Sequence, residues 1–396
     1  MRVVIAPDCF GGTLTAEQAA AAVRDGWLRA AAGDQLDLSP MADGGPGFVH
    51  TLHATLGGEV IAATVRSPVH EPVPGTVLVV DRPGGVRTAY VESAQAAGLA
   101  LVRPERRDPG RTSTGGVGEL LRLALGTGAR RVVVGLGGTA TNDAGAGMLA
   151  ALGVGAGPAG VLAGGGGGLG AVTAADLAGL AQVRASFAGI DLVVATDVDV
   201  PLLGLHGASA GFAPQKGATA QQAQELERAL GHFSHAAVSA LGADAGRPDL
   251  LAPRRTASPA ARLTGLPGAG AGGGLGFGLA LLGATIVSGS ALVADAVGLA
   301  GRIAAADLVV TGEGTFDWQS LHGKVVAVVA DLALAAGVPT VVIAGQVRVG
   351  RREWGAAGIA GVYPVADTPE QVTRSFADPS GTLAARAERV ARTWSR

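Results

Sequence analysis

Short hydrophobic runs alternate along this chain with loops rich in glycine and acidic residues. The run Arg2–Ala6 leads into the loop 7–14, and apolar residues at helical spacing then cover 16–31. The same order of strand, loop and helix returns over 36–56 and again after 308–310. The pattern predicts an α/β fold whose loops share one edge of a parallel sheet, where ligands bind in such folds.

The pattern changes near residue 60. Three runs rich in β-branched residues, 60–65, 73–80 and 86–91, are separated by proline and glycine turns. Such runs are typical of an antiparallel or mixed sheet and not of repeated βαβ units. Since 396 residues also exceed the size at which one hydrophobic core usually keeps growing, we expect two domains with a boundary near this point.

The stretch 135–148, read as G-L-G-G-T-A-T-N-D-A-G-A-G-M, is the most concentrated candidate site. It follows the β-branched run 131–134, and a glycine turn that starts a helix exposes backbone N–H groups that favour an anion. We therefore interpret it as a phosphate cradle. The alternative is that 65 glycines in one chain produce such runs by composition alone. Composition does not explain its polar residues, which are Thr139, Thr141, Asn142 and Asp143.

Acidic residues follow several of the predicted strands. Asp197 comes directly after the run 192–196, and an acid in this position can bind Mg²⁺ or accept the proton of a substrate hydroxyl. Both functions are needed in phosphoryl transfer, and the alternative is ordinary turn chemistry. The other acids in such loops are Asp8, Asp43, Glu313 and Asp317.

Lysine is scarce, because only Lys216 and Lys324 occur among 30 cationic residues. Lys216 lies in the sequence P-Q-K-G, and Lys324 lies at the start of a predicted helix that runs to residue 336. The scarcity weakens the interpretation of either residue as an ordinary solvated side chain. Both are therefore candidate partners of a phosphate group.

Three further loops are rich in small residues. The loop 267–276 contains Gly272 and Gly273 and permits close approach to a nucleotide, although a linker has a similar composition. The segment 112–114 places three hydroxyl groups before a helix predicted over 119–125. The five-glycine run 164–168 is interpreted as a flexible loop.

Composition excludes several classes of protein. A net charge of −2 and a pI near 6.4 offer no basic surface for nucleic acid. The single cysteine, Cys9, excludes an intramolecular disulfide framework and a zinc site built on several thiolates. The early Asp8 leaves no room for a signal-peptide apolar region, so we expect a cytoplasmic protein. Two uncharged tracts, 144–175 and 275–294, are expected to be buried elements and not membrane spans.

Several familiar catalytic motifs are absent. The chain has no G-x-x-x-x-G-K-[ST], and no G-x-G-x-x-G after its first strand, which disfavours an NAD-linked oxidoreductase. The sequence 207–211 matches G-x-S-x-G, but no β-branched strand precedes it, so we interpret Ser209 as a chance match and not a nucleophile. Two histidine pairs lack a neighbouring carboxylate or thiol cluster, which disfavours a metal site. They are His50 with His53 and His232 with His235.

Eight motifs occur between about residue 3 and residue 346. They are Ala6-Pro-Asp8, Ala42-Asp-Gly-Gly45, Gly118-Glu-Leu120, Gly135 to Met148, Thr196-Asp-Val198, Pro214-Gln-Lys-Gly-Ala218, Pro267 to Gly274, and Thr311-Gly-Glu-Gly314 with Asp317 and His322-Gly-Lys324. In this order they resemble the bacterial glycerate kinases of the two-domain glycerate 2-kinase type. No single motif is specific, but the set is.

The resemblance implies ATP-dependent, Mg²⁺-assisted phosphorylation of glycerate, with 2-phosphoglycerate as the expected product. It implies a flavodoxin-like (Rossmann-like) α/β/α domain of residues 1–60 and 290–396, with a second α/β domain of residues 61–289 inserted. The family's active site lies in the cleft between the domains. Glycerate and ATP are the expected partners, nucleic acid and membrane are not, and the sequence is compatible with a homodimer.

The resemblance also gives each candidate residue an expected role. Asp197 is the expected catalytic base or Mg²⁺ ligand, and Lys216 is expected to stabilise the transferring phosphate. The expected substrate-binding residues are Asp8, Asp43, Glu313 and Asp317. The expected nucleotide- and phosphate-binding residues are Gly137, Gly138, Thr139, Thr141, Asn142, Gly272, Gly273 and Lys324.

The chain departs from the family pattern at three positions. Similar proteins usually carry a lysine where this chain has Gly11, a glutamate at Pro46 and an asparagine at Val200. The loss of a cation and a carboxylate leaves two alternatives open. One is a kinase of a different hydroxy acid, and the other is a catalytically impaired relative that binds a small hydroxy acid and has a regulatory role.

Overall fold

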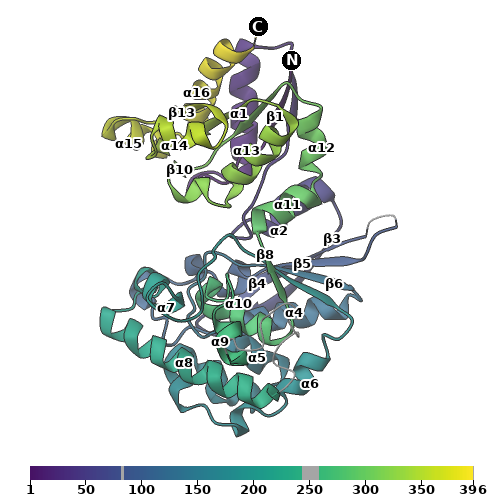
Figure 1. Ribbon diagram of the computed structural model, residues 1–396, viewed down its shortest axis with the longest axis vertical. Helices are drawn as coiled ribbons and strands as arrows, with labels where there is room; N and C mark the ends of the chain where they lie inside the picture. The colour runs from purple at the N-terminus through teal and green to yellow at the C-terminus, as the bar shows by residue number, and fades with distance from the viewer. Residues whose placement is uncertain (82–83, 243–257, 396) are drawn as a thin grey trace. The chain divides into compact units, whose positions relative to one another are not determined.

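The computed structural model describes residues 1–81, 84–242 and 258–395 (Figure 1). The chain divides into two compact units. Unit 1 consists of Met1–Asp43, His50–Gly57 and Ser288–Arg396, and unit 2 consists of Gly44–Val49 and Gly58–Val287. Unit 2 thus includes the short segment Gly44–Val49, which the predicted division assigned to the other domain.

Unit 1 is built on a five-stranded parallel sheet with the strand order β13-β11-β9-β1-β2. Counted along the chain from the β2 edge, this order is 2-1-3-4-5, which is the flavodoxin-like order. The prediction of a flavodoxin-like domain made from both chain ends is confirmed. The strands are β1 (Arg2–Ile5), β2 (Gln35–Leu38), β9 (Leu308–Thr311), β11 (Thr340–Ala344) and β13 (Ile359–Pro364), and a separate parallel pair is formed by β10 (Thr315–Phe316) and β12 (Gln346–Val347).

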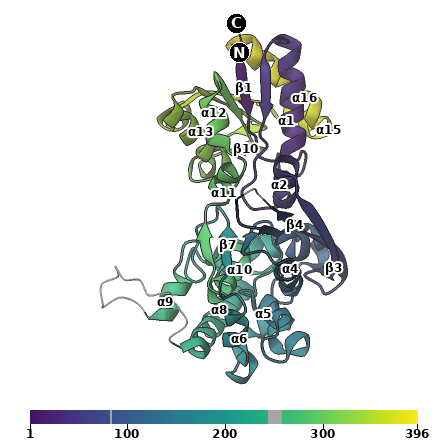
Figure 2. The ribbon, with the colours of Figure 1, turned by 90° about the vertical axis from the view of Figure 1, so that its right-hand side faces the viewer.

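Helices cover both faces of this sheet, because its strands are apolar on both sides. Figure 2 shows α1 (Ala16–Ala30) and α16 (Pro379–Trp394) on one side of β1, and α12 (Leu299–Ala304) and α13 (Val325–Ala336) on the other. Val341 and Ile343 of β11 belong to the core cluster that contains α1 and α16 residues, whereas Val342 and Ala344 belong to the cluster that contains α13 residues. The other α-helices that lie wholly in the described part of unit 1 are α11 (Gly289–Ala296), α14 (Arg351–Ala356) and α15 (Pro369–Ala377).

Local chemistry explains how α1 begins and how it packs. The Thr15 side chain accepts the N–H of Gln18, and the Gln18 side chain accepts the N–H of Thr15, which is the capping box that their spacing predicts. A Cβ atom on Gly26 would lie 2.0 Å from the carbonyl oxygen of Ala384 in α16. Glycine at this position therefore permits the two helices to pack closely.

Unit 2 is built on a six-stranded mixed sheet whose strand order follows the chain. The first two pairings are antiparallel and the remaining three are parallel. The prediction of an antiparallel or mixed sheet after residue 60 is confirmed, and the carboxyl ends of its last four strands lie at one edge. The strands are β3 (Glu59–Arg66), β4 (Pro72–Val80), β5 (Thr88–Glu92), β6 (Arg131–Gly135), β7 (Asp191–Ala195) and β8 (Thr285–Val287).

Helices and 3₁₀ turns complete unit 2. Phe233 of α8 and Phe277 of α10 meet edge to face, with ring centroids 6.4 Å apart, in its core. The helices are α3 (Ala94–Ala97), α4 (Gly115–Gly126), α5 (Ala146–Leu152), α6 (Leu180–Ala185), α7 (Ala208–Phe212), α8 (Ala220–Leu241), α9 (Pro259–Thr264) and α10 (Ala271–Leu281). A further helix, α2 (Phe48–Leu56), begins in unit 2 and continues in unit 1.

The uncharged tracts 144–175 and 275–294 form short helices, 3₁₀ turns and strand β8, as expected for buried elements. Among the described residues, one stretch meets the length and composition criteria for a membrane span, and it is Gln319–Ala336. It ends in α13, where Val326 and Ala330 are buried in the core of unit 1. A core helix satisfies the same criteria.

Two predicted elements differ from the structure. Helix α4 begins at Gly115 and not at residue 119, and its first turns contain Gly116 and Gly118, where a Cβ atom would lie 1.9 Å from the carbonyl oxygen of Arg66 and 2.5 Å from that of Met148. The run 164–168 is not a flexible loop, since it forms parts of two 3₁₀ turns, Val161–Gly164 and Gly166–Ala171.

Candidate functional site

The glycine turn after β6 is held against neighbouring backbone. A Cβ atom on Gly137 would lie 2.5 Å from the Cα of Gly45, and one on Gly138 would lie 2.7 Å from Cγ of Pro46. Gly138 also has a φ of +61°, which favours glycine. The N–H of Leu99 donates to the carbonyl oxygen of Gly138 at 2.7 Å. Close approach therefore explains these glycines independently of any ligand.

The expected free N–H groups at the start of the following helix are absent, and this part of the prediction is wrong. Helix α5 begins at Ala146, and the N–H groups of Gly145 and Gly147 donate to the side chain of Asp143 at 3.1 and 3.2 Å. The N–H of Met148 donates to the hydroxyl of Thr114 at 2.9 Å. The chain's own carboxylate thus occupies the start of α5, and phosphate binding by the turn 137–142 stays a prediction.

Lys216 lies inside the same part of unit 2. It ends the 3₁₀ turn Pro214–Lys216, is 3% exposed, and donates to the carbonyl oxygen of Thr141 at 2.7 Å and to the hydroxyl of Thr139 at 3.3 Å. Burial lowers the pKa of Lys216 to about 8, while the charge of Asp143 acts to raise it. Lys216 is therefore not a solvent-exposed lysine. It forms hydrogen bonds with two predicted cradle residues, Thr139 and Thr141.

Asn142 is a buried polar residue with spare hydrogen-bonding capacity. Its Nδ2 donates to the hydroxyl of Ser209 at 3.1 Å, and its Oδ1 has no partner among the described residues. Ser209 is fully buried in α7, so its contact suits a supporting residue and not a nucleophile. A buried amide oxygen without a partner is costly, which marks Asn142 as a candidate ligand-binding residue.

The second glycine loop packs on the first. Gly272, Gly273 and Gly274 all have positive φ, and a Cβ atom on Gly273 would lie 1.9 Å from the carbonyl oxygen of Thr141. The N–H of Ala144 donates to the carbonyl oxygen of Gly273 at 3.1 Å. Nucleotide binding by Gly272 and Gly273 remains a prediction, but their observed close contact is with the cradle itself.

Gly166 is a residue that the sequence interpretation missed. A Cβ atom there would lie 2.1 Å from the carbonyl oxygen of Asn142, so the 3₁₀ turn that begins at Gly166 also packs against the cradle. A run of five glycines carries no side-chain signal that distinguishes one of them. Only the fold shows which glycine is required.

Asp197 lies at the same sheet edge as the glycine turn. The register of β6 and β7 pairs Gly135 with Ala195. Gly137 lies two residues after Gly135, and Asp197 lies two residues after Ala195, so both come just after the paired ends of neighbouring strands. The next residues pack on the second glycine loop, because the N–H of Gly270 donates to the carbonyl oxygen of Val200 at 3.0 Å. The edge of the sheet thus brings together Asp197 and both glycine loops.

A group of carboxylates occupies the corresponding edge of the sheet in unit 1. Asp8 and Glu313 follow the neighbouring strands β1 and β9, and the N–H of Asp8 donates to the carbonyl oxygen of Gly312 at 2.8 Å. Burial raises the pKa of Asp8 to about 8, and the negative charges of Asp43 and Glu313 add to this effect. Burial also raises the pKa of Glu313 to about 7, although Ser320 and Lys324 act in the opposite direction.

Asp317 and Lys324 lie in the loop that follows Glu313. Asp317 accepts the N–H of Gln319 at 2.9 Å, and Lys324, the residue directly before α13, donates to the side chain of Gln319 at 3.4 Å. Both residues belong to unit 1. Lys324 therefore lies in the same unit as the predicted substrate-binding acids, and its role in nucleotide binding stays a prediction.

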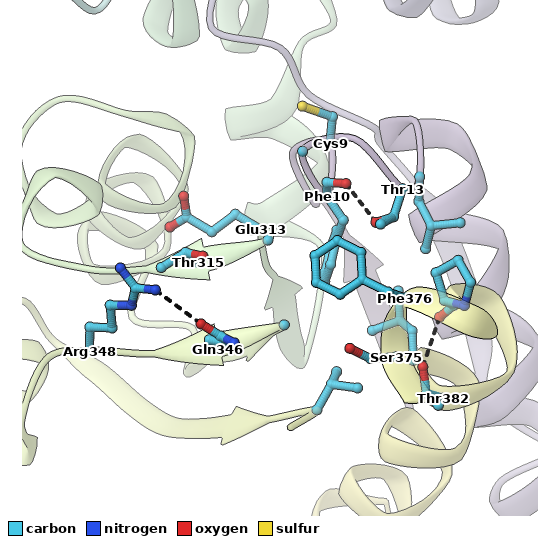
Figure 3. Close-up of a pocket in the computed structure, with 17 residues that line it drawn as sticks. Cys9, Phe10, Thr13, Glu313, Thr315, Gln346, Arg348, Ser375, Phe376 and Thr382 are labelled. Atoms are coloured by element: carbon cyan, nitrogen blue, oxygen red, sulfur yellow. Dashed lines mark hydrogen bonds between the residues drawn. The ribbon is translucent and has the colours of Figure 1, made fainter. Parts of the chain in front are cut away.

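A cavity of about 550 Å³ in unit 1 is lined by one of these acids, Glu313. Figure 3 shows Glu313, Thr315 and Arg348 on one side of Phe10, and Ser375 and Thr382 on the other. Arg348 directly follows β12, the short strand that comes after β11, so the rule that ligands bind at the carboxyl ends of strands could have identified it. Phe376 of α15 also lines the cavity, and nothing in the local sequence indicates this.

Comparison with known proteins supports the motif resemblance. The family profile described as the Glycerate kinase family matches residues 3–395. A glycerate kinase of Bacillus subtilis (strain 168) is 39% identical over 350 residues, which cover 88% of this chain and 85% of that protein. A glycerate 2-kinase of Escherichia coli (strain K12) is 36% identical over 349 residues, which cover 87% of this chain and 85% of that protein.

A solved structure has the same fold over the whole chain. The crystal structure assigned to glycerate kinase 2 of Salmonella typhimurium LT2 matches with a TM-score of 0.76 and 34% sequence identity, and the match covers 99% of this chain and 98% of that one. Profile, relatives and structure agree along nearly the full length. The chain therefore belongs to the glycerate kinase family of enzymes.

Proposed function

We propose that this enzyme transfers the γ-phosphoryl group of ATP to the 2-hydroxyl of glycerate and so forms 2-phosphoglycerate and ADP. The names of the Bacillus subtilis and Escherichia coli relatives support the substrate, and the latter supports the 2-position. The observation that carries the proposal is the buried ammonium group of Lys216 at the turn of Thr139 and Thr141. Fixed positive charge in a site that excludes water is what phosphoryl transfer requires.

We assign phosphate binding to the turn Gly137–Asn142 together with Lys216. Two of the three N–H groups of the Lys216 ammonium have protein acceptors, and in the described part of the chain no acceptor takes the third. That N–H group would bind an oxygen of the transferring phosphate. The unpartnered Oδ1 of Asn142 accepts hydrogen bonds only, so it suits a donor on the substrate or on bound water and not a phosphate oxygen.

We assign the proton transfer to Asp197. The hydroxyl oxygen of glycerate bonds to the γ-phosphorus, the bond between that phosphorus and ADP breaks, and the hydroxyl proton passes to the carboxylate of Asp197. Because phosphoryl transfer needs little covalent chemistry from the protein, positioning and charge stabilisation supply most of the rate enhancement.

The residues of this site are compatible with a Mg²⁺ ion that is held mainly by the phosphate oxygens of the nucleotide. Among the described residues no group of three or more His, Cys, Asp or Glu side chains is placed to hold a metal ion. Mg²⁺ in nucleotide sites commonly binds phosphate oxygens, water and one or two carboxylates, so Asp197 can serve as its protein ligand. When bound, Mg²⁺ neutralises negative charge on the phosphate oxygens.

We assign glycerate binding to the acids of unit 1. Asp8, Asp43 and Glu313 would accept hydrogen bonds from the substrate hydroxyls. Glycerate is an anion, and three ionised acids would repel it. The raised pKa values of Asp8 and Glu313 keep these side chains partly protonated near pH 7, which reduces the repulsion and provides a donor for the substrate carboxylate.

Phosphorylation of a larger hydroxy acid is a second candidate function. The cavity beside Glu313 measures about 550 Å³, which falls in the range of sites that bind molecules much larger than glycerate. Gly11, where similar proteins carry lysine, lines this cavity, and a Cβ atom there would meet nothing within 4 Å. The lost side chain therefore leaves additional open space.

The test is an assay with MgATP and D-glycerate in which ADP release and product are followed together. Enolase added without phosphoglycerate mutase detects 2-phosphoglycerate, and a panel of longer hydroxy acids tests the second candidate. ADP release with glycerate and an enolase signal support the proposal. Thermal stabilisation by glycerate without ADP release would contradict it and favour a binding protein.

A further inference from the structure

Asp143 has an unusual number of hydrogen-bond donors for a buried side chain. It is fully buried, and its Oδ2 accepts the N–H and the hydroxyl of Thr114 at 2.8 and 2.9 Å and the N–H of Gly147 at 3.2 Å. Its Oδ1 accepts the N–H of Gly145 at 3.1 Å. The residue thus connects the cradle turn with the starts of α4 and α5.

The directions of these bonds indicate that Asp143 is ionised. The hydroxyl of Thr114 also accepts the N–H of Met148 at 2.9 Å, so its own hydrogen points to Asp143. A protonated carboxyl would have to direct its O–H at one of four donors. Burial raises the pKa of Asp143, and the four donated hydrogen bonds act in the opposite direction.

Lys216 is a buried cation whose pKa responds to the charge of Asp143, yet the two side chains form no ion pair. Its ammonium contacts the carbonyl oxygen of Thr141, two residues before Asp143, and the hydroxyl of Thr139. Among the described residues, Asp143 is the ionisable group whose charge acts on Lys216. Ser209 of α7, which contacts Asn142, carries no charge, and neither do Pro214 and Gln215, which precede Lys216 in its 3₁₀ turn.

We propose that Asp143 is a positioning residue, which holds the turn Thr139–Asn142 on Thr114 and α5 and keeps the ammonium of Lys216 charged in the protein interior. This inference rests on the proposed phosphoryl transfer, in which Lys216 neutralises phosphate. A direct salt bridge would occupy the ammonium. A carboxylate that does not contact the ammonium still favours its charged form and leaves an N–H group for the ligand.

The charge effect can be measured without an activity assay, because the chain has only two lysines. In protein labelled with ¹³C at the lysine Cε atoms, Lys324→Arg leaves one signal, which reports the titration of Lys216. We expect a midpoint near pH 8. Asp143→Asn should move the midpoint to lower pH by about one unit, a tenfold change in the ratio of charged to neutral lysine. An unchanged midpoint would overturn the proposal, whatever reaction the enzyme catalyses.

Kinetics then connect this charge to the reaction. In wild type, kcat/KM should fall at alkaline pH as Lys216 loses its proton, and Asp143→Asn should move this fall to lower pH. In a Lys216→Arg background the same substitution should cause no such movement, because arginine stays charged. An equal loss of activity at every pH in both backgrounds would indicate a purely structural role and overturn the proposal. Absence of ADP release by wild type would count against the proposed function alone, since the titration of Lys216 is independent of it.

Thr114 provides a second test if Asp143→Asn does not fold. Thr114→Val removes the hydroxyl that donates to Asp143 and accepts from Met148, whereas Thr114→Ser keeps it. We expect about a tenfold lower kcat for the valine variant with little change in KM, and recovery in the serine variant. Wild-type kcat in Thr114→Val would overturn the positioning role.

Discussion

The ammonium nitrogen of Lys216 lies 2.7 Å from the carbonyl oxygen of Thr141, which is 75 residues earlier in the chain. A backbone carbonyl carries only a partial charge, so this contact fixes the ammonium without neutralising it. The side chain is also buried, where Coulomb interactions are stronger than in water. The arrangement thus preserves a positive charge for an anionic ligand.

Removal of this charge should abolish activity and yet stabilise the fold. We expect Lys216→Met to lower kcat at least 100-fold, because the transferring phosphate loses its cation. The free energy of unfolding at pH 7 should rise by about 1 kcal/mol or more, since a buried unpaired charge is removed. Assay and thermal melting of the same preparation measure both effects. For the stability measurement the matched control is Lys324→Met, which removes a half-buried lysine of unit 1, and a Lys216→Met variant less stable than wild type would contradict the argument.

Lys216 also makes stability depend on alkaline pH. Its pKa is lowered in the folded protein from the ordinary lysine value of 10.5 to about 8, so the unfolded chain binds more protons between these values. The free energy of unfolding therefore carries no penalty from Lys216 above pH 10.5, and it decreases as pH falls toward 8 because the unfolded chain takes up a proton that the buried side chain does not. The difference in unfolding free energy between wild type and Lys216→Met should therefore shrink as pH rises from 8 to 10.

The acids of unit 1 should have the opposite effect at lower pH. The folded pKa of Asp8 is raised to about 8, so the stability it contributes is present below about pH 4 and is lost as pH rises toward 8. Asp8→Asn should flatten the decline in melting temperature between pH 5 and pH 8. Asp25→Asn, which alters an exposed acid of α1, is the control. A decline that is equal in both variants would show that Asp8 does not cause it.

Gly166 tests the packing beneath the cradle. A methyl group at this position would come within 2.1 Å of the carbonyl oxygen of Asn142, whereas one at Gly170, in the same 3₁₀ turn, would meet nothing within 4 Å. We expect Gly166→Ala to lower the free energy of unfolding by about 1–3 kcal/mol and to reduce kcat. Gly170→Ala should behave like wild type in urea unfolding and in the assay. Equal effects of the two substitutions would contradict the packing argument.

Asp197 should be required for turnover. Asp197→Asn keeps the size of the side chain and removes the proton acceptor, so we expect kcat to fall at least about 100-fold. Asp199→Asn, an exposed acid two residues further on, should retain most of the activity. Near-normal turnover of Asp197→Asn in the coupled assay would remove this residue from its assigned role.

Local sequence chemistry predicts the elements of this fold well and their contacts poorly. The capping box at Thr15 and the β-branched run before Gly135 each act within a few residues, and both elements occur as predicted. The role of Asp143 depends on Thr114, 29 residues away, and that of Gly166 depends on Asn142. Such contacts follow from packing between distant segments, so the sequence indicates free N–H groups at the start of α5 where the structure has an internal carboxylate.

The last prediction concerns substrate choice, and it rests on Gly11. This residue lines the cavity beside Glu313, and a side chain there would extend into open space. If glycerate binds near these acids, Gly11→Lys supplies a cation for its carboxylate and should lower KM for glycerate about threefold to tenfold, with little change in KM for ATP. Gly33→Lys adds the same charge at another open position and should change neither constant. If the enzyme prefers a larger hydroxy acid, the new lysine should instead raise KM for that substrate, because it fills the space that the larger molecule needs.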